Sequence, residues 1–148
     1  MKKNFEPCFI DTNILVYATF EESEFFDKAI EFLEGGNFSL MFISRQVIFE
    51  YLRTVTSNRI YRNSLSIKEA LSNLEIFLEN ISIVPIEANP DFEKIKTDLI
   101  KYKINREKIF DYQIILTIKA NSILSIATAN EKDFSFCKDI KIINPFKN

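Results

Sequence analysis

The strongest indication of the fold comes from residues 9–18, FIDTNILVYA. The apolar run at residues 5–10 predicts a short buried strand, and a helix is predicted directly after it, over residues 12–20. A strand that runs straight into a helix is typical of crossover units, in which parallel strands alternate with helices. Ligands bind at the carboxyl ends of the strands in such sheets, so Asp11 stands where a site would form.

The rest of the chain repeats this alternation, and Ser44 and Ser66 are the predicted N-caps of two of its helices. We therefore expect a three-layer α/β/α fold, in which helices flank a mostly parallel central sheet. The chain shows no repeat, linker or low-complexity tract, so we expect one domain over residues 1–148. Further helices are predicted over residues 24–34, 44–56, 66–78, 90–102 and 110–121, and further strands over 38–43, 81–86, 123–127 and 140–143.

The composition excludes several kinds of chemistry. The chain has no His, and its two cysteines are Cys8 and Cys137, which rules out Ser-His-Asp and Cys-His pairs and the zinc sites that need imidazole or paired thiolates. The two glycines are neighbours, Gly35 and Gly36, so no glycine-rich phosphate loop can form. A metal, if one is bound, would be a hard cation with oxygen ligands.

Charge and hydropathy place the chain among cytoplasmic proteins. No window reaches the ~18 consecutive apolar residues of a membrane helix, and Glu6, Pro7 and Asp11 interrupt a start that would otherwise suggest a signal peptide. The net charge is −2, yet residues 35–68 carry four Arg and one Lys against Glu50 alone. The sequence thus predicts a basic segment within an acidic protein that has no contact with membranes.

Two acidic residues follow predicted strands. Asp11 comes directly after the strand at residues 5–10, and Asp133 follows the strand at residues 123–127. Taken singly, Asp11 could be an N-cap, and Asp133 could belong to a capping arrangement with Asn130. Both nevertheless stand at the edge of the sheet where a ligand would bind.

Two more acidic residues lie on predicted helices. Asp111 opens the helix at residues 110–121, where N-capping is the alternative role. Glu50 lies at the edge of the apolar stripe of the helix at residues 44–56, and its alternative is a solvated pair with Arg53. Each alternative is reasonable alone, but the order of the four acids along the chain carries further information.

Together these acids make the sequence resemble the PIN-domain ribonucleases, and most of all the VapC-type toxins of bacterial toxin–antitoxin pairs. The resemblance extends from residue 5 to about residue 146, with all blocks in the family's order. The blocks are FIDTNILVYA at 9–18, SRQVIFE at 44–50, KIFD at 108–111, TANEKDF at 128–134 and IINP at 142–145.

The resemblance implies an endoribonuclease that hydrolyses RNA phosphodiester bonds with water activated by Mg²⁺ or Mn²⁺. It implies that Asp11 and Asp111 bind the metal directly, and that Glu50 and Asp133 bind through water, hold a second ion or orient the nucleophile. Asn130 and Asp133 remain alternatives for the fourth position. The residues implied to hydrogen-bond around these acids are Asn13, Thr128 and Asn130.

The resemblance also implies partners, since VapC-type proteins form homodimers and bind an antitoxin, an Arg of which can enter the acidic site. The basic segment is the candidate contact for RNA or for a partner, and a solvated basic face is its alternative. Its candidate residues are Arg45, Arg53, Arg59 and Arg62, with Tyr51 and Tyr61 for base stacking.

Two other function classes remain open. A PIN-like fold could serve as a non-catalytic RNA-binding or assembly module, although the presence of all four acids disfavours this. An aspartyl-phosphate phosphatase would also place an Asp after the first strand, but that chemistry needs an acid two positions later, where this chain has Asn13.

Overall fold

The computed structural model describes residues 6–36, 38 and 40–148, and its centre is a parallel sheet. The strand order is β3-β2-β1-β4-β5, and every neighbouring pair is parallel. The expected parallel α/β architecture is therefore confirmed. The strands are β1 (Cys8–Ile10), β2 (Met41–Ile43), β3 (Ile81–Ile83), β4 (Ser125–Ala127) and β5 (Lys141–Ile143).

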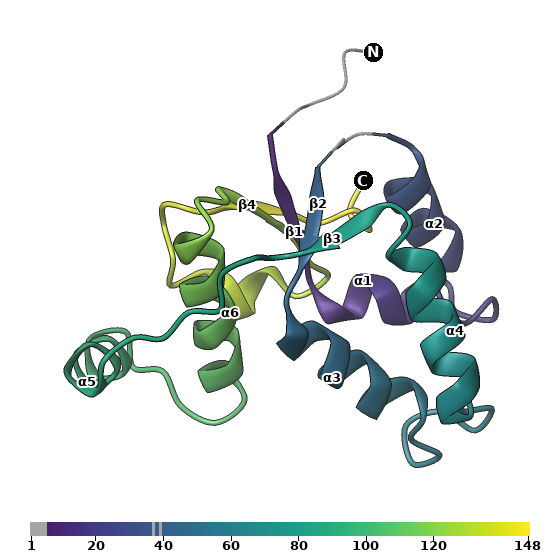
Figure 1. Cartoon of the computed structure of the whole chain (residues 1–148), viewed down its shortest axis with the longest axis horizontal. Helices are drawn as coiled ribbons and strands as arrows, with labels where there is room; N and C mark the ends of the chain where they lie inside the picture. The colour runs from purple at the N-terminus through teal and green to yellow at the C-terminus, as the bar shows by residue number, and fades with distance from the viewer. Residues whose placement is uncertain (1–5, 37, 39) are drawn as a thin grey trace.

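Helices cover both sides of this sheet. Figure 1 shows α6 to the left of the strands and α2 and α4 to the right, with α5 apart from the other helices at the left edge. None of the helices in the described part of the chain is long and apolar enough to cross a membrane. The helices are α1 (Thr12–Tyr17), α2 (Phe26–Glu34), α3 (Arg45–Val55), α4 (Ile67–Phe77), α5 (Phe92–Lys101), α6 (Lys108–Ala120) and the 3₁₀-helix η1 (Glu131–Phe134).

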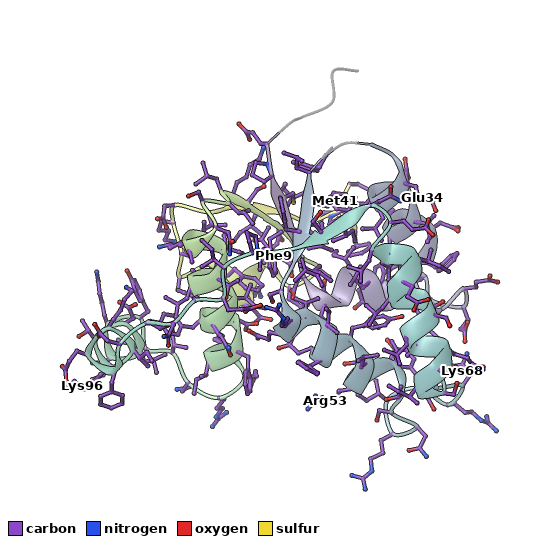
Figure 2. All side chains as sticks on the ribbon, viewed as in Figure 1. Phe9, Glu34, Met41, Arg53, Lys68 and Lys96 are labelled. Carbon is purple, nitrogen blue, oxygen red and sulfur yellow. The ribbon has the colours of Figure 1, made fainter. Side chains whose placement is uncertain are left out.

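The core lies around the two central strands, β1 and β4. All three residues of β1 are completely buried, and so are Ile126 and Ala127 of β4. Phe9 pairs with Phe42 on one side and with Ile126 on the other, which fixes the register of the central strands. Figure 2 shows Phe9 at the centre of the molecule, whereas Lys68 and Lys96 lie at its periphery. Burial on both faces explains why these strands read as uninterrupted apolar runs.

The predicted elements are all present, but most are shorter than their apolar patterns. The N-caps at Ser44 and Ser66 are confirmed, and Ser66 forms a reciprocal capping box with Glu69. Parts of two predicted strands, at Phe5 and Ser39, lie outside the described residues. Each strand has only three residues, and the apolar residues next to them differ in burial. Val84 and Ile123 are buried in loops, whereas Leu40 and Ile86 are exposed.

Two predicted helix starts are wrong by a few residues. Helix α6 begins at Lys108, so Asp111 lies within its first turn and is not its N-cap. Helix α5 begins at Phe92 and is capped by Asp91, whose carboxylate accepts a hydrogen bond of 2.8 Å from the Lys94 amide. Side-chain capping by Asp91 sets that start, and Pro90 lies just before the cap.

The cap residue at the end of α6 is Asn121, which has φ −100°, and the next residue, Ser122, takes a positive φ of 56°. The Asn121 amide accepts a hydrogen bond from the Ile86 backbone N–H and donates one to its carbonyl, at 3.1 and 2.7 Å. The Asn121 side chain thus joins the end of α6 to the segment that follows β3.

Candidate active site

The topological switch point of the sheet, where the strand order reverses, lies between β1 and β4. From β1 the chain builds outward through β2 and β3 on one side, and β4 and β5 occupy the other side. Asp11 directly follows β1 and Thr128 directly follows β4. Their side chains meet, because the Thr128 hydroxyl donates a hydrogen bond of 2.7 Å to Asp11 Oδ2. This is where parallel sheets bind ligands.

Four hydrogen bonds fix the loop around Asp11. Its Oδ1 accepts from the Thr12 backbone N–H at 2.8 Å, so Asp11 also caps α1 as the sequence allowed. Its Oδ2 accepts a second hydrogen bond, from the Asn13 amide at 3.1 Å. Asn13 Oδ1 in turn accepts from the Ala129 backbone N–H at 3.0 Å. The loops that follow β1 and β4 are thereby tied together around one carboxylate.

Burial controls the ionisation of Asp11. The residue is 7% exposed, and burial raises the pKa of its carboxyl to about 6. Hydrogen bonds from Thr128 and from the Thr12 backbone lower this pKa, whereas the charges of Glu50 and Asp133 raise it. The ionised carboxylate is therefore stabilised by donors from the loops after β1 and β4, and destabilised by burial and by nearby acids.

Glu50 enters the same region from α3 and is held by two donors. Its Oε2 accepts from the Thr12 hydroxyl and its Oε1 from the Gln46 amide, both at 2.8 Å. Gln46 also donates to the Phe110 backbone carbonyl at 3.1 Å, which links α3 to the first turn of α6. Among the described residues Glu50 forms no ion pair with Arg53, so the alternative of a solvated surface pair does not hold.

Sequence reasoning missed Thr12 and Gln46 as residues of this site. Gln46 lies four positions before Glu50 on one helix, a spacing that places the two side chains on the same face. That spacing was a usable signal. Thr12 offered no comparable signal, because its hydroxyl meets Glu50 only when α1 packs against α3.

Asp111 completes the acidic side of the site from the first turn of α6. Burial and, after it, the charges of Asp133, Asp11, Glu50 and Glu107, in that order, together raise its pKa to about 7. Carboxylates from four separate segments thus line the same cavity and repel one another. Asp133 belongs to η1, whose cap residue is Asn130.

The four acids line one open cavity of about 710 Å³. Thr128 stands behind Asp11 and does not itself line the cavity. Arg53 is the one member of the predicted basic set among the lining residues, and Figure 2 shows it on α3 at the lower side of the molecule. The main lining residues are Asp11, Asn13, Tyr17, Phe49, Glu50, Arg53, Tyr61, Phe110, Asp111, Asn130 and Asp133.

The other predicted basic residues lie elsewhere. Arg45 pairs with Glu87 at 3.3 Å, and Arg59 and Arg62 are exposed in the segment that joins α3 to α4. The structure therefore brings together the four acids, Asn13, Asn130 and one arginine, and leaves three arginines outside the cavity. Tyr51 is also removed from any base-stacking role, because it is completely buried and donates or accepts a hydrogen bond with Thr19.

The donor set is chemically uniform. Apart from the Arg53 guanidinium, the polar side chains at the cavity carry carboxylates, amides and hydroxyls, whose oxygens suit Mg²⁺ or Mn²⁺ better than a soft metal. As the side chains stand, residues 6–36, 38 and 40–148 contain no set of three or more His, Cys, Asp or Glu side chains grouped closely enough to hold one ion. Donor chemistry and mutual repulsion thus fit a cation, whereas a closed ligand cage is not formed.

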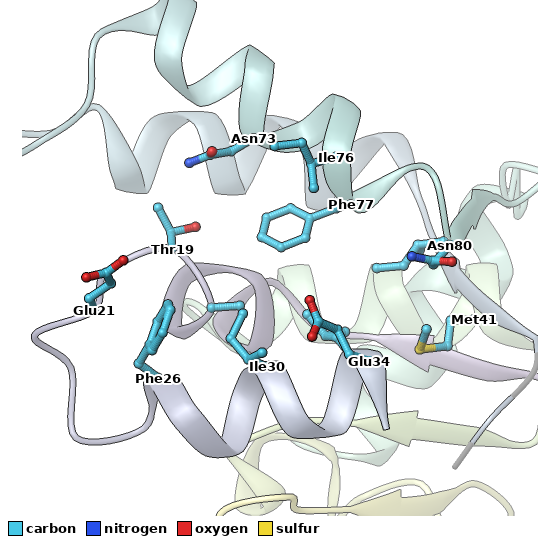
Figure 3. A pocket seen from close by; sticks show the side chains of 13 residues that line it. Thr19, Glu21, Phe26, Ile30, Glu34, Met41, Asn73, Ile76, Phe77 and Asn80 are labelled. Carbon is cyan, nitrogen blue, oxygen red and sulfur yellow. The ribbon is translucent and has the colours of Figure 1, made fainter. Parts of the chain in front are cut away.

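A second cavity has a different character. It measures about 270 Å³ and lies between α2 and α4, where Figure 3 shows Phe26 and Ile30 facing Phe77 and Ile76. Its lining residues, all of them described, include no Lys or Arg, and the two glutamates among them stand at its rim. This cavity has neither the acid cluster nor the cation of the first one, so it does not share its chemistry.

These features are those of a parallel α/β protein whose acidic cavity opens at the carboxyl edge of its sheet. The model of the PIN domain family matches residues 8–137, so the chain belongs to the PIN domain family. No curated protein matches the sequence.

Solved structures with the same fold include toxin–antitoxin proteins. VapBC2 from Rickettsia felis, solved with a DNA fragment from its promoter, is 22% identical with a TM-score of 0.64, over 93% of this chain and 98% of that one. VapBC-1 from nontypeable Haemophilus influenzae is 17% identical with a TM-score of 0.64, over 95% and 99%. VapC20 from Mycobacterium tuberculosis, a toxin that cleaves the sarcin-ricin loop, is 16% identical with a TM-score of 0.57, over 80% and 86%.

Proposed function

We propose that the protein is a Mg²⁺- or Mn²⁺-dependent endoribonuclease and the toxin of a toxin–antitoxin pair. The observation that carries this proposal is the convergence of Asp11, Glu50, Asp111 and Asp133 on one cavity at the switch point of the sheet. Membership of the PIN domain family and the fold shared with VapC20, a toxin that cleaves the sarcin-ricin loop, support it.

Asp11 and Asp111 are the proposed direct ligands of the metal. Burial and neighbouring acids raise the pKa values of both carboxyls, so their ionised forms are disfavoured in the folded protein. A bound divalent cation would supply that compensation, lower the pKa of a water molecule and polarise the scissile phosphate. Glu50 and Asp133 would bind through water or orient the attacking water, and Asn130 is the alternative to Asp133 in the fourth position.

The remaining residues hold these acids in place. Thr128 and Asn13 orient Asp11 through Oδ2, and Thr12 and Gln46 orient Glu50 through its two oxygens. Arg53 lies in the same cavity without an acidic partner among the described residues, so its guanidinium is available to an RNA phosphate.

The proposed partners are a second copy of the chain and a cognate antitoxin, and the proposed location is the cytoplasm. The VapBC relatives named above are toxin–antitoxin structures, which supports the antitoxin. A cavity lined by five acidic residues, Glu107 among them, and one arginine would accept an arginine of such a partner.

The direct test measures cleavage of RNA by the purified protein. We expect cleavage with Mg²⁺, none in excess EDTA and none by the Asp11→Asn variant. Cleavage that persists in excess EDTA would contradict a metal-dependent mechanism. Binding of RNA without cleavage, together with no effect of Mn²⁺ on the melting temperature, would favour a non-catalytic module instead.

The toxin assignment needs a separate test. Expression of the wild-type chain should arrest bacterial growth, and co-expression of a small protein encoded next to it should restore growth. A chain that cleaves RNA but leaves growth unchanged would be a nuclease with another cellular role. The phosphatase alternative is disfavoured because Asn13, an amide bonded to Asp11 and Ala129, occupies the place of its second acid.

A further inference from the structure

Two tyrosine hydroxyls at the acidic cavity have no hydrogen-bond partner among the described residues. Tyr17 ends α1 and Tyr61 follows α3, and both are half-buried residues that line the cavity. The hydroxyls of Tyr51 and Tyr112 each bond to another side chain, whereas those of Tyr17 and Tyr61 bond to none in the part of the chain that the structure describes. A phenol in this state is free to donate a hydrogen bond to a ligand.

Aromatic packing holds both tyrosine rings in place. The centroid of the Tyr17 ring lies 4.9 Å from that of Phe25 and 5.3 Å from that of Phe146. The Tyr61 ring stacks on the buried ring of Phe20 at 4.1 Å, so one of its faces is covered and closed to a base. Burial and, after it, the charge of Tyr17 raise the pKa of Tyr61, so its hydroxyl keeps its proton. The two donors are thus preorganised, and a ligand that binds them pays little for ordering.

A guanidinium lies at the same part of the cavity. Arg53 lines it, is exposed and forms no ion pair within residues 6–36, 38 and 40–148. Arg53 is about 4.5 Å beyond Glu50 along α3, and Tyr17 is about 9 Å beyond Asp11 along α1. Figure 1 shows that both helices extend to the right from the lower ends of β1 and β2. The cavity therefore has acids close to the strands and three donors farther along the helices.

This division of the cavity suits two consecutive phosphates of one chain. RNA that places one phosphate at the acids brings the next phosphate near them as well, where the same carboxylates repel it. A guanidinium and two phenols would offset that repulsion, because hydrogen bonds to the unesterified oxygens of a phosphate are assisted by charge.

We propose that Tyr17, Tyr61 and Arg53 form a subsite for the phosphate next to the scissile one, and that this subsite sets which linkage of the RNA lies at the acids. The inference rests on the proposed nuclease function and adds residues that position its substrate. Contacts with phosphate fix the register of a nucleic acid and carry no sequence information. The subsite is therefore expected to act on RNA of any sequence.

The test combines protein variants with single neutral linkages in the RNA. A short fluorescent RNA, in which one phosphate at a time is replaced by a methylphosphonate, is titrated with protein that carries Asp11→Asn to prevent cleavage. Each methylphosphonate follows a 2′-deoxy sugar that keeps the linkage stable, and the reference RNA carries the same sugar. Binding is followed by anisotropy, and the cleaved linkage is mapped separately with the wild-type chain.

The expected result is a coupling between one linkage and the three residues. A methylphosphonate at the linkage beside the cleaved one should weaken binding about ten-fold. Tyr17→Phe and Tyr61→Phe should each weaken binding of the reference RNA about five-fold. In a variant that combines both changes with Arg53→Ala, the methylphosphonate at that linkage should have almost no further effect, because its partners are already absent.

Tyr102→Phe is the matched control. Tyr102 is 41% exposed at the end of α5 and does not line the cavity, so loss of its hydroxyl should leave binding unchanged. The Phe variants at Tyr17 and Tyr61 retain the rings and their aromatic packing, so they should fold. Circular dichroism of each variant checks this.

Three results would overturn the inference. They are unchanged binding by both Phe variants, equal losses from the methylphosphonate in variant and parent protein at every linkage, and coupling at a linkage that is not beside the cleaved one. Failure of the proposed function is distinguishable from these. RNA that shows the coupling but is never cut would remove the nuclease and keep the phosphate subsite, whereas cleavage with purely additive losses would do the reverse.

Discussion

The hydroxyl of Thr128 donates a hydrogen bond of 2.7 Å to Oδ2 of Asp11, a residue 117 positions earlier in the chain. This contact joins the carboxyl ends of the two central strands and lies almost entirely out of solvent, with Thr128 completely buried. It favours the ionised form of Asp11, because a donor to a carboxylate lowers the carboxyl pKa. The site therefore depends on a bond between the two halves of the sheet.

Replacement of Thr128 by Val should shift the pH dependence of cleavage. The variant keeps the shape of the side chain but loses the hydroxyl, so the pKa of Asp11 should rise above its value of about 6. The acidic limb of the cleavage rate against pH should move to higher pH, and the free energy of unfolding should fall by about 1–2 kcal/mol. Thr128→Ser should restore both. An unchanged pH profile for the Val variant would contradict this role.

Metal-free protein should lose stability as the pH rises. The pKa values of Asp11 and Asp111 are raised to about 6 and about 7, so the folded chain binds more protons than the unfolded chain between about pH 4 and pH 7. Their contribution to stability is thus present below the unfolded pKa and lost as the pH rises through the native values. Thermal melts in EDTA should show a lower melting temperature at about pH 8 than at about pH 5.

Addition of Mn²⁺ should reverse this loss. At a concentration about 100-fold above its dissociation constant, the ion should raise the melting temperature at about pH 8 by about 5–10 °C. The increase should be smaller at about pH 5, because protons compete with the cation for the carboxylates. Equal increases at both pH values would argue against binding to these acids.

Asp111→Asn should stabilise the metal-free protein while it abolishes cleavage. Every influence on Asp111 raises its pKa, so the ionised carboxylate is unfavourable in the folded state and a neutral amide is not. The melting temperature in EDTA at about pH 8 should therefore rise, and the response to Mn²⁺ should disappear. Asp27→Asn, at an exposed position in the first turn of α2, is the control and should change neither.

Gln46→Ala should lower activity through Glu50. The variant removes the donor to Glu50 Oε1 and the link to the Phe110 carbonyl, so the glutamate and the start of α6 lose a common support. We expect about 1 kcal/mol less stability and a fall in the cleavage rate that exceeds any change in RNA affinity. Gln113→Ala, at an exposed position of α6, is the control. Equal cleavage by the two variants would exclude the supporting role.

Arg53→Ala should weaken RNA binding more than Arg59→Ala does. Arg53 lines the cavity, whereas Arg59 is exposed in the segment between α3 and α4. Loss of a phosphate contact should also reduce the slope of log affinity against log salt concentration by about one. The salt slope, measured by anisotropy, distinguishes a contact with phosphate from a general effect of charge. Similar losses for both variants would place the RNA path outside the cavity.

Helix caps and apolar runs predicted the helices and strands well, because these patterns depend on interactions between residues that are near one another in sequence. Ser66 is predicted as the N-cap of α4, and the structure confirms it and adds a reciprocal capping box with Glu69. The apolar run at β1 predicts burial on both faces, and Cys8, Phe9 and Ile10 are completely buried. Helix starts were less well predicted, since α5 is capped by Asp91 and α6 begins after Glu107 without any side-chain cap.

The sequence by itself determined the alternation of strands and helices, the exclusion of histidine and thiolate chemistry, and the positions of four acids in order along the chain. Only the tertiary structure decided which polar residues accompany those acids. Thr12 reaches Glu50 across 38 positions, and one of four candidate arginines lines the cavity. The physical reason is that periodicity and capping act within a few residues, whereas burial, charge coupling and hydrogen bonds across the sheet depend on how distant elements pack.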